Sequence, residues 1–257
     1  SSEPLELIGF FPLCRENTFR VLPIRHLMLW QHKYCFLCTP LVHTARAHEC
    51  MSAFFDWLVD ERHGIDLMVF NQIGGDGPFQ QLVDDRIIEH RLRRYCADCD
   101  SRAAFLPAAD AETYLQKTLS SEYRRQMKRK EKRLAECGRI EYVTLTQNGD
   151  PEAWLEQFLH LENSGWKGRE GSALASTPAG RSYFLEIVYE AYRRGKLIMQ
   201  GLMLDGRPIA QYCAFTAGIG SFDFKPAYDE DYSRFSPGIL LELERFRHLH
   251  TRPDLAW

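Results

Sequence analysis

The sequence predicts an α+β fold in which a mixed, mostly antiparallel sheet is flanked by helices. Strand-like and helical hydrophobic patterns alternate along the chain. The clearest local signal is Asp205-Gly206, which separates two apolar segments and provides the residues that a two-residue type I′ hairpin needs. Hydrophobic residues make up 45% of the 257 residues and charged residues 26%, which is ordinary for a globular protein with a buried core.

Composition excludes several classes of protein. A net charge of -3 gives no overall attraction to nucleic acid or to an anionic membrane, so we expect no DNA partner. No run reaches the ~18 apolar residues of a membrane span. The start, "SSEPLELIGFFP", lacks the pattern of a signal peptide, and we expect it to be a boundary cut from a longer chain. Eight cysteines scattered through apolar segments favour reduced thiols and a cytoplasmic location.

The first part of the chain has a mixed pattern. Helices are predicted where apolar residues recur at three- and four-residue steps, over 46–62 and 79–95. Strands are predicted in short segments rich in aliphatic and aromatic residues, over 22–30, 34–42, 65–73 and 101–107. We expect residues 1–110 to form one unit.

The second part, residues 111–257, predicts the order α-β-α-α-β-β-β-α. A long helix is expected from Asp110 to Cys137, and the next begins with Asp150 as N-cap and Pro151 in the first turn. Another helix is expected over 181–195 and the last over 239–249. The strands are expected at 139–146, 196–204, 207–217 and 221–225.

Three segments resemble a known family: "ENSGWKGREGSAL" (162–174), "LDGRPIAQYCAF" (204–215) and "FDFKPAYDEDYSRFSPGILL" (222–241). They are similar to the acetyltransferases named after the cellulose-biosynthesis protein CelD, within the GNAT superfamily, which is related to the Fem-type transferases with two GNAT-like halves. The resemblance covers about residues 115–250. It implies a GNAT fold, a tandem of a degenerate first half and a complete second half, and acetyl-CoA or another acyl-CoA as co-substrate, with no metal.

The start of the last helix is the candidate phosphate site. A helix N-terminus offers about four unpaired amides and roughly half a positive charge, which favours anions. Ser236 is a good N-cap and Gly238 allows close approach to the backbone. With the resemblance, the predicted CoA-binding residues here are Arg234, Phe235, Ser236 and Gly238. The alternative is that Ser-Pro-Gly only caps the helix.

GNAT enzymes also present backbone amides of a splayed strand to the thioester, and the resemblance assigns this role to the strand 208–215. The residues expected there are Tyr212, Cys213, Ala214 and Phe215. Tyrosine often protonates the leaving thiolate in this superfamily, which makes Tyr228 a catalytic candidate and Tyr232 a substrate-binding candidate. The alternative is that both tyrosines are wall residues.

Lys225 ends an alternating strand, so Asp223 and Lys225 are expected to share one face and to orient an acceptor or stabilise an oxyanion. The alternative is an exposed ion pair worth well under ~1 kcal/mol. Glu162 is the acid of the first similar segment that a helix can turn toward the site. Trp166 and Lys167 follow as an aromatic and basic pair for substrate binding, or as a core residue and a solvated one.

Two other patterns are weaker evidence for function. Cys35-x-x-Cys38 and Cys96-x-x-Cys99 are too far apart for a compact zinc module, so no metal site is predicted. The basic segment 123–133 keeps an apolar stripe and is interpreted as a helix with a solvated basic face; contact with an anionic polymer or with tRNA is the alternative.

The leading hypothesis is an acyl-CoA-dependent N-acyltransferase that acts on an amine of a sugar, amino acid or small metabolite. A Fem-like transferase that uses aminoacyl-tRNA is the second hypothesis, and a catalytically silent GNAT-like module that binds polysaccharide or a partner is the third. The residues alone do not specify the acceptor or the acyl chain length.

Overall fold

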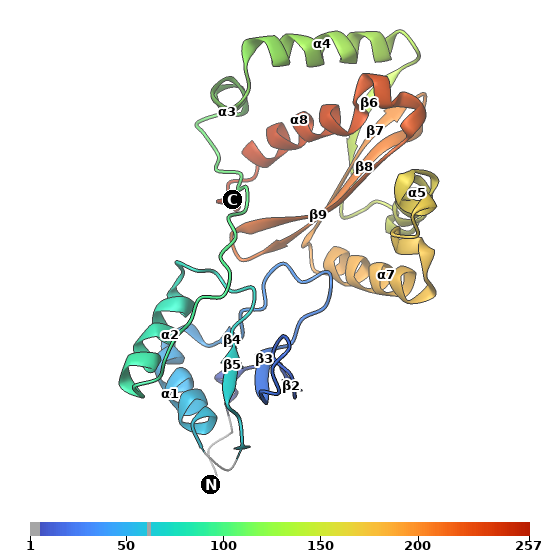
Figure 1. The fold of residues 1–257 in the computed structure, drawn as a ribbon. Coiled ribbons are helices and arrows are strands. Elements are labelled where there is room, and N and C mark those ends of the chain that lie inside the picture. Colours follow the sequence, from blue (N-terminus) through green and yellow to red (C-terminus); the bar gives the residue numbers. More distant parts are fainter. Residues whose placement is uncertain (1–5, 61–62) are drawn as a thin grey trace. The chain divides into compact units, whose positions relative to one another are not determined.

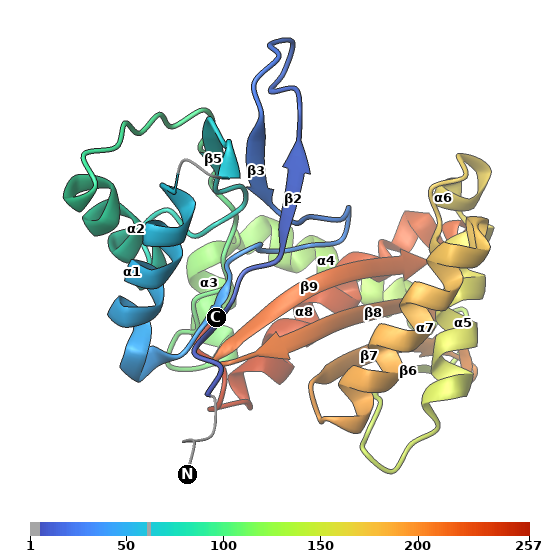
Figure 2. The same ribbon diagram turned by 90° about the horizontal axis from the view of Figure 1, so that it is seen from below.

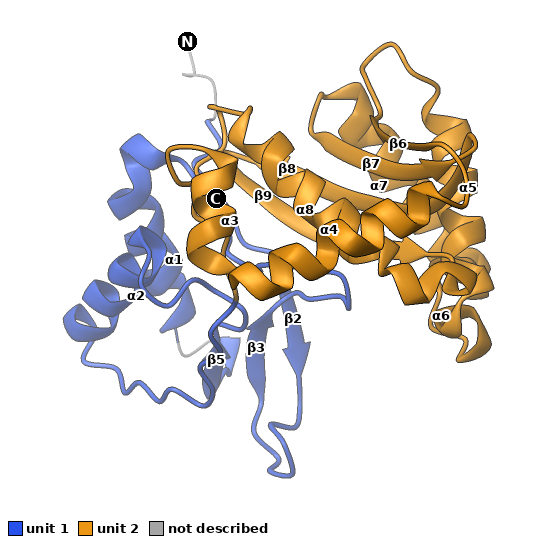
Figure 3. Ribbon diagram, turned by 90° about the horizontal axis from the view of Figure 1, so that it is seen from above, with its two compact units in different colours: residues 1–102 blue, residues 103–257 orange. Residues whose placement is uncertain are grey.

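The computed structural model describes residues 6–60 and 63–257. The chain divides into two compact units, residues 1–102 and residues 103–257, coloured separately in Figure 3. Each unit is described by itself below. All of the predicted site residues belong to the second unit. The descent of the first unit from a GNAT half remains a prediction.

The first unit contains short strands and two helices. Strand β2 (Leu13–Glu16) pairs antiparallel with β3 (His26–Leu29), which pairs parallel with β5 (Leu67–Val69). A second, two-stranded sheet joins β1 (Gly9–Phe10) and β4 (Leu41–Val42). A short turn, η1 (Thr44–Arg46), leads into α1 (Ala47–Leu58), and α2 (Pro78–Glu89) follows β5. The two helices share a core formed by Met51, Phe54, Phe55 and Val83.

Two predicted strands of this region are wrong. Of the segment 34–42 only Leu41–Val42 forms a strand, because the Cys38 amide donates instead to the carbonyl of Gln72 and Pro40 has no amide to donate. The segment 101–107 forms no strand. Its largest apolar side chain, Phe105, stacks on Phe246 instead. Both predicted helices are shorter than expected, and residues 61–62 of the first lie outside the described residues.

The second unit is built on a four-stranded antiparallel sheet in the order β6-β7-β8-β9. The hairpin turn is confirmed, because Asp205 and Gly206 have φ of 49° and 79° and type I′ turns require positive φ at both positions. The strands are β6 (Ile140–Thr144), β7 (Leu197–Leu204), β8 (Arg207–Ala217) and β9 (Gly220–Tyr228).

Helices cover both faces of this sheet, as Figures 1 and 2 show. On one face, called here the α5 face, lie α5 (Pro151–Ser164) and α7 (Pro178–Arg193). On the other, the α8 face, lie α8 (Pro237–His250) and α4 (Ser121–Ala135). Shorter elements complete the unit: α3 (Ala111–Thr118), α6 (Trp166–Arg169), η3 (Leu174–Ser176) and η4 (Glu230–Phe235). The predicted α+β class is confirmed.

The long helix predicted from Asp110 to Cys137 is two helices. Leu119 has extended φ and ψ of -118° and 138°, and the Ser120 hydroxyl accepts a hydrogen bond from the Tyr123 amide at 3.2 Å. Ser120 is therefore the N-cap of α4, and a capping serine favours a helix start over a helix interior.

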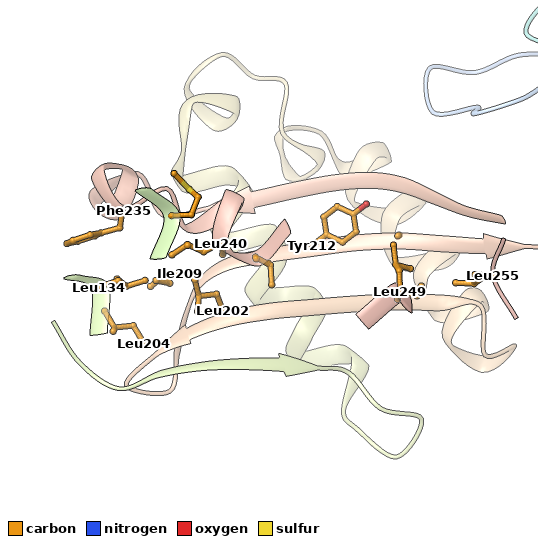
Figure 4. Close-up of a cluster of buried hydrophobic side chains, with 14 residues drawn as sticks. Leu134, Leu202, Leu204, Ile209, Tyr212, Phe235, Leu240, Leu249 and Leu255 are labelled. Atoms are coloured by element: carbon orange, nitrogen blue, oxygen red, sulfur yellow. The ribbon is translucent and has the colours of Figure 1, made fainter. Parts of the chain in front are cut away.

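The main core of this unit lies between the sheet and α8 (Figure 4). Leu202 and Ile209 of the sheet are fully buried against Leu240 and Leu249 of α8, and Leu134 of α4 closes the cluster. Burying a side chain of this size contributes about 1.5–3 kcal/mol. This core fixes α8 against the sheet and so fixes the start of α8. In the part of the chain that the structure describes, no helix is long and apolar enough to cross a membrane.

Candidate active site

Strand β9 is an edge of the four-stranded sheet among the described residues. Its pairing with β8 has one irregularity. Lys225 lies opposite Cys213 and Asp223 lies opposite Ala214, so Phe224 is an extra residue and forms a β-bulge. Because Cys213 and Ala214 are consecutive in β8, they point to opposite faces, and so do the residues opposite them.

The prediction that Asp223 and Lys225 share a face is therefore wrong. Asp223 Oδ1 accepts a hydrogen bond at 2.7 Å from Arg245 Nη1 on α8. Lys225 Nζ donates at 2.8 Å to Glu162 Oε1 on α5. The bulge at Phe224 breaks the two-residue alternation on which the prediction rested, and alternation alone does not reveal a bulge.

Two groups of charged residues lie on opposite sides of β9. The first, on the α5 face, is called here the Glu162 cluster and consists of Glu162, Lys225 and Lys167. The Glu162 side chain is fully buried, and its Oε1 lies 2.8 Å from Lys225 Nζ and 3.8 Å from Lys167 Nζ. Its Oε2 accepts a hydrogen bond at 2.8 Å from the Leu174 amide. Both carboxylate oxygens are thus engaged, so this residue ties α5 to β9 and to η3. That arrangement suits the positioning of Lys225 better than proton abstraction.

Lys167 lies in α6 (Trp166–Arg169). Its Nζ also donates to the Pro226 carbonyl at 2.9 Å. Burial lowers the pKa of the Lys167 ammonium, the Glu162 carboxylate raises it, and Lys225 lowers it further. The Trp166 side chain, by contrast, is 45% exposed, and its amide donates to Glu230 Oε1 at 2.8 Å. The predicted aromatic and basic pair thus provides a partly buried amine next to an accessible ring.

The second group is the Arg245 cluster: Arg245, Asp223 and Glu242. Arg245 is buried, donates to both carboxylates, and its guanidinium lies 4.4 Å from the ring centroid of Tyr212. Burial raises the pKa of Tyr212, which Arg245 opposes and Asp223 supports. This cluster was missed from the sequence. The signal was available, because residue 245 falls on the stripe of Leu241 and Leu249 at four-residue steps.

The four predicted thioester-facing residues lie in the interior of the sheet. Tyr212, Cys213, Ala214 and Phe215 each pair with β7 on one side and with β9 on the other. Cys213 is fully buried, and burial raises the pKa of its thiol. Because β8 lies between β7 and β9, the backbone of this stretch is used in strand pairing on both sides. A ligand that approaches the sheet edge meets β9 instead.

The start of α8 differs in detail from the predicted cap. Ser236 is the N-cap residue, but its backbone is left-handed (φ 54°, ψ 54°) and its side chain caps no amide. Its Oγ accepts a hydrogen bond at 2.6 Å from Lys130 Nζ of α4. The first turn of α8 therefore has no side-chain cap, and a lysine lies beside it. Such a helix start favours an anion.

Of the other predicted residues near this helix start, some are accessible and some are packed in or against the core. A Cβ on Gly238 would lie 3.6 Å from the Tyr228 ring, so Tyr228 packs beside the first turn while remaining 37% exposed. Arg234 is exposed, whereas Phe235 is buried in the main core and Tyr232 packs against that core. Phe235 and Tyr232 thus have structural positions in this arrangement.

Two further polar residues were not foreseen. Lys130 was assigned to a solvated basic face but reaches Ser236. Gln211 is buried on β8, two residues before Cys213, and neither of its amide atoms has a hydrogen-bond partner in the protein. Two-residue spacing in a strand puts Gln211 on the same face as Cys213 and hence as Lys225.

Comparison with protein families gives one match. Residues 121–255 match the family described as Acetyltransferase (GNAT) domain, which is more than half of the chain. The chain belongs to this GNAT acetyltransferase family. No curated protein matches the sequence. The GNAT match begins at the first residue of α4 and includes the Glu162 cluster, the Arg245 cluster and the start of α8.

The GNAT match implies acetyl-CoA as co-substrate, and the residues at the start of α8 fit its pyrophosphate. The first turn lacks a side-chain cap, Lys130 Nζ lies at the N-cap hydroxyl, and Arg234 is exposed in the preceding turn. Charge and backbone donors thus converge at one point. Within residues 6–60 and 63–257, no group of three or more His, Cys, Asp or Glu side chains is placed to hold a metal ion.

Proposed function

We propose that the chain is an acyl-CoA-dependent N-acyltransferase of the CelD-like family. It moves an acetyl or other acyl group from a CoA thioester to an amine of a sugar, an amino acid or a small metabolite. The observation that carries the proposal is the start of α8 in a GNAT domain: it has no side-chain cap, Lys130 lies beside it, and Tyr228 at the end of the bulged edge strand packs against it.

The acyl-CoA supplies an activated acyl group, and the helix start binds its phosphates. The first-turn amides of α8, with Lys130 and Arg234, provide backbone donors and two positive charges. Gly238 keeps the backbone open to a ligand. Ser236 contributes through its left-handed backbone, which turns the chain into the helix, and through its bond to Lys130.

We assign the role of facing the thioester to the edge strand β9 instead of to residues 208–215. Bulges commonly occur beside active sites, because they interrupt the ladder and redirect side chains. Phe224 is the extra residue of this bulge, so the backbone around it is the proposed source of donors to the carbonyl oxygen. Tyr228, farther along the same strand, is the proposed donor of a proton to the leaving thiolate.

The acceptor is proposed to bind on the α5 face, beside the Glu162 cluster and Trp166. The Glu162 carboxylate fixes Lys225, so the ammonium is held in one position and is not a free surface charge. Two ammonium groups around one carboxylate leave one positive charge in excess, which attracts an electron-rich group of the acceptor. The acceptor amine loses its own proton through water, so no protein base is assigned.

Calorimetry with acetyl-CoA and CoA tests this proposal. The wild-type protein should bind both, and Gly238→Val should weaken binding about tenfold or more while the melting temperature stays within a few degrees, because the branched side chain blocks approach to the helix start. Gly75→Val, at a glycine with open space around it, is the matched control. The absence of binding at millimolar ligand, or a Gly238→Val effect on melting temperature alone, would contradict the proposal.

A Fem-like transfer from aminoacyl-tRNA is the second candidate, and one observation favours it. The exposed side of α4 carries five basic residues at three- and four-residue spacing: Arg125, Lys128, Arg129, Lys132 and Arg133. Such a stripe can follow a phosphate backbone. Binding of tRNA that weakens steeply with salt, and is lost when the five residues are replaced by glutamine, would favour this candidate over the first.

We also propose that residues 1–102 derive from a degenerate GNAT half and that the protein acts in the cytoplasm, with polysaccharide biosynthesis as one setting for a CelD-like enzyme. The cytoplasmic location is supported by the eight cysteines, all of which are free thiols. Labelling with a membrane-permeant thiol reagent in intact cells, compared with an impermeant one, tests it.

A further inference from the structure

A cavity of about 210 Å³ lies on the α8 face, at the edge of the sheet opposite β9. It is formed by the edge strand β6, the neighbouring strand β7, the part of α8 from Leu241 onward and Thr251. The start of α8, where the proposed CoA site lies, is not part of it. The lining residues with polar side chains that matter here are Tyr142, Thr144, Gln200, Glu244, Arg247, His248 and Thr251.

Gln200 is the unexplained group in this cavity. It is 3% exposed, its Nε2 donates to Thr144 Oγ1 at 3.2 Å, and its Oε1 has no partner in the protein. The Thr144 hydroxyl can either donate or accept, so either orientation of the amide leaves one of its polar atoms unpaired. A buried polar atom without a partner costs about 1–3 kcal/mol, and a ligand hydroxyl toward which the amide turns would remove that cost.

The charges around the cavity cancel. Glu244 Oε2 accepts a hydrogen bond at 2.9 Å from Arg247 Nη1. Burial lowers the pKa of His248 and Arg252 lowers it further, while Glu244 opposes both, so the imidazole is neutral near pH 7. Burial and Glu131 raise the pKa of Tyr142, whose hydroxyl donates to Glu131. The wall is polar and carries no net charge.

We propose that this cavity binds a small, uncharged, hydroxyl-bearing ligand of about the size of one sugar ring. A hydroxyl both donates and accepts, so it satisfies Gln200 in either orientation. Thr144, Thr251 and the neutral His248 provide further partners of the same kind. The volume is below the roughly 300–1,000 Å³ of sites for drug-sized ligands, which favours a single ring over a nucleotide or CoA.

This ligand site is distinct from the proposed transfer site. Gln200 lies on β7 and Thr144 on β6, whereas Lys225 and Tyr228 lie on β9 at the other edge of the sheet. The inference therefore stands or falls on its own binding measurement, whether or not the chain transfers acyl groups.

Titration of the full chain by ligand-observed NMR tests the inference, with D-glucose and D-galactose as uncharged probes and D-glucuronate and D-galacturonate as charged ones, none of which carries an amine or an amide. At least one uncharged probe should bind, and more tightly than both charged ones. Gln200→Leu should weaken that binding tenfold or more. Gln211→Leu is the matched control, because Gln211 is also a buried strand glutamine with unpaired amide atoms but lies on the α5 face; it should leave sugar binding unchanged.

If Gln200→Leu does not fold by circular dichroism, Thr144→Val and His248→Phe replace it, and each should weaken binding several-fold. Three results would overturn the inference: no binding of either uncharged probe, equally tight binding of the charged probes, or affinity unchanged by the cavity variants. Any of these means that the cavity holds water only or that the sugar binds elsewhere.

Discussion

The two charged clusters on either side of β9 differ in which partner is buried. In the Arg245 cluster the buried group is the guanidinium, and its carboxylate partners Asp223 and Glu242 are 54% and 33% exposed. In the Glu162 cluster the carboxylate is fully buried and both ammonium partners are about four-fifths buried as well. Water therefore reaches one cluster and is largely excluded from the other.

The difference indicates different purposes. Charges that remain in contact with water are screened and lose little when a partner is removed, whereas charges kept away from water depend on one another. The Arg245 cluster holds α8 to the sheet. The Glu162 cluster holds an ammonium group at one place on the α5 face, which is what binding of an acceptor requires. The predictions below test this contrast, from the largest expected effect to the smallest.

Glu162→Leu should have the largest effect. The substitution leaves two mostly buried ammonium groups without their carboxylate and leaves the Leu174 amide without its acceptor. Breaking a buried pair in this way costs about 3–5 kcal/mol. Urea denaturation would measure the loss of unfolding free energy. The double variant Glu162→Leu/Lys225→Met removes a stranded charge and should recover part of that loss; no recovery would mean that the carboxylate acts through packing alone.

Arg245→Met should destabilise the protein less. It removes the ion pairs to Asp223 and Glu242, but water reaches both carboxylates and screens each pair to about 1 kcal/mol or less. The methionine retains some of the packing against Tyr212. The same urea experiment compares the two variants directly, and a loss equal to that of Glu162→Leu would show that the two clusters are equivalent.

Lys225→Gln should separate the clusters by function. If the α5 face binds the acceptor, this variant lowers kcat/KM for acyl transfer about tenfold, or roughly 1.4 kcal/mol, without changing the affinity for acetyl-CoA. Asp223→Asn, one residue before the bulge and on the other face, is the control and should stay within about twofold. Equal losses from both variants, in a coupled assay of released CoA thiol, would contradict the assignment of the acceptor to the α5 face.

The pH dependence of stability should show the smallest effect. The pKa of Lys167 is lowered in the folded protein from 10.5, chiefly by burial. Between the folded and unfolded pKa values the unfolded chain binds more protons, so this residue makes stability rise as pH increases through the window below 10.5. Lys167→Met should lack that rise. If the pH profiles of unfolding free energy for the wild type and for Lys167→Met run parallel, folding does not lower the pKa of Lys167.

Local rules predicted most of the second unit from the sequence. The Asp205-Gly206 turn, the Asp150 cap and the Pro151 first turn each depend on residues adjacent in the chain, and each was predicted correctly. The same rules misplaced the break at Ser120, because an apolar stripe that continues across a capping serine outweighed the cap signal. Strand 101–107 failed because its hydrophobicity serves a contact with α8, distant in sequence.

The candidate site was predictable in its residue types but less so in its arrangement. Lys225, Glu162 and Lys167 were singled out, and they lie together. That they form one cluster, and that Asp223 belongs to another, depends on a bulge and on helices packed against opposite faces. Those features follow from pairing and packing across long sequence separations, which alternation within a strand does not record.

The extra residue at Phe224 also has a consequence for comparing and engineering related chains. Deleting that one residue would restore strict alternation and keep both charged side chains on their present faces, because Lys225 already lies opposite Cys213 and Asp223 opposite Ala214. Straightening the strand with Phe224 kept in the ladder would instead put both side chains on one face, so that Lys225 would leave Glu162 or Asp223 would leave Arg245. Related sequences with one fewer amino acid here should therefore keep the two clusters, whereas sequences that keep the residue but lose the bulge should carry a differently organised surface.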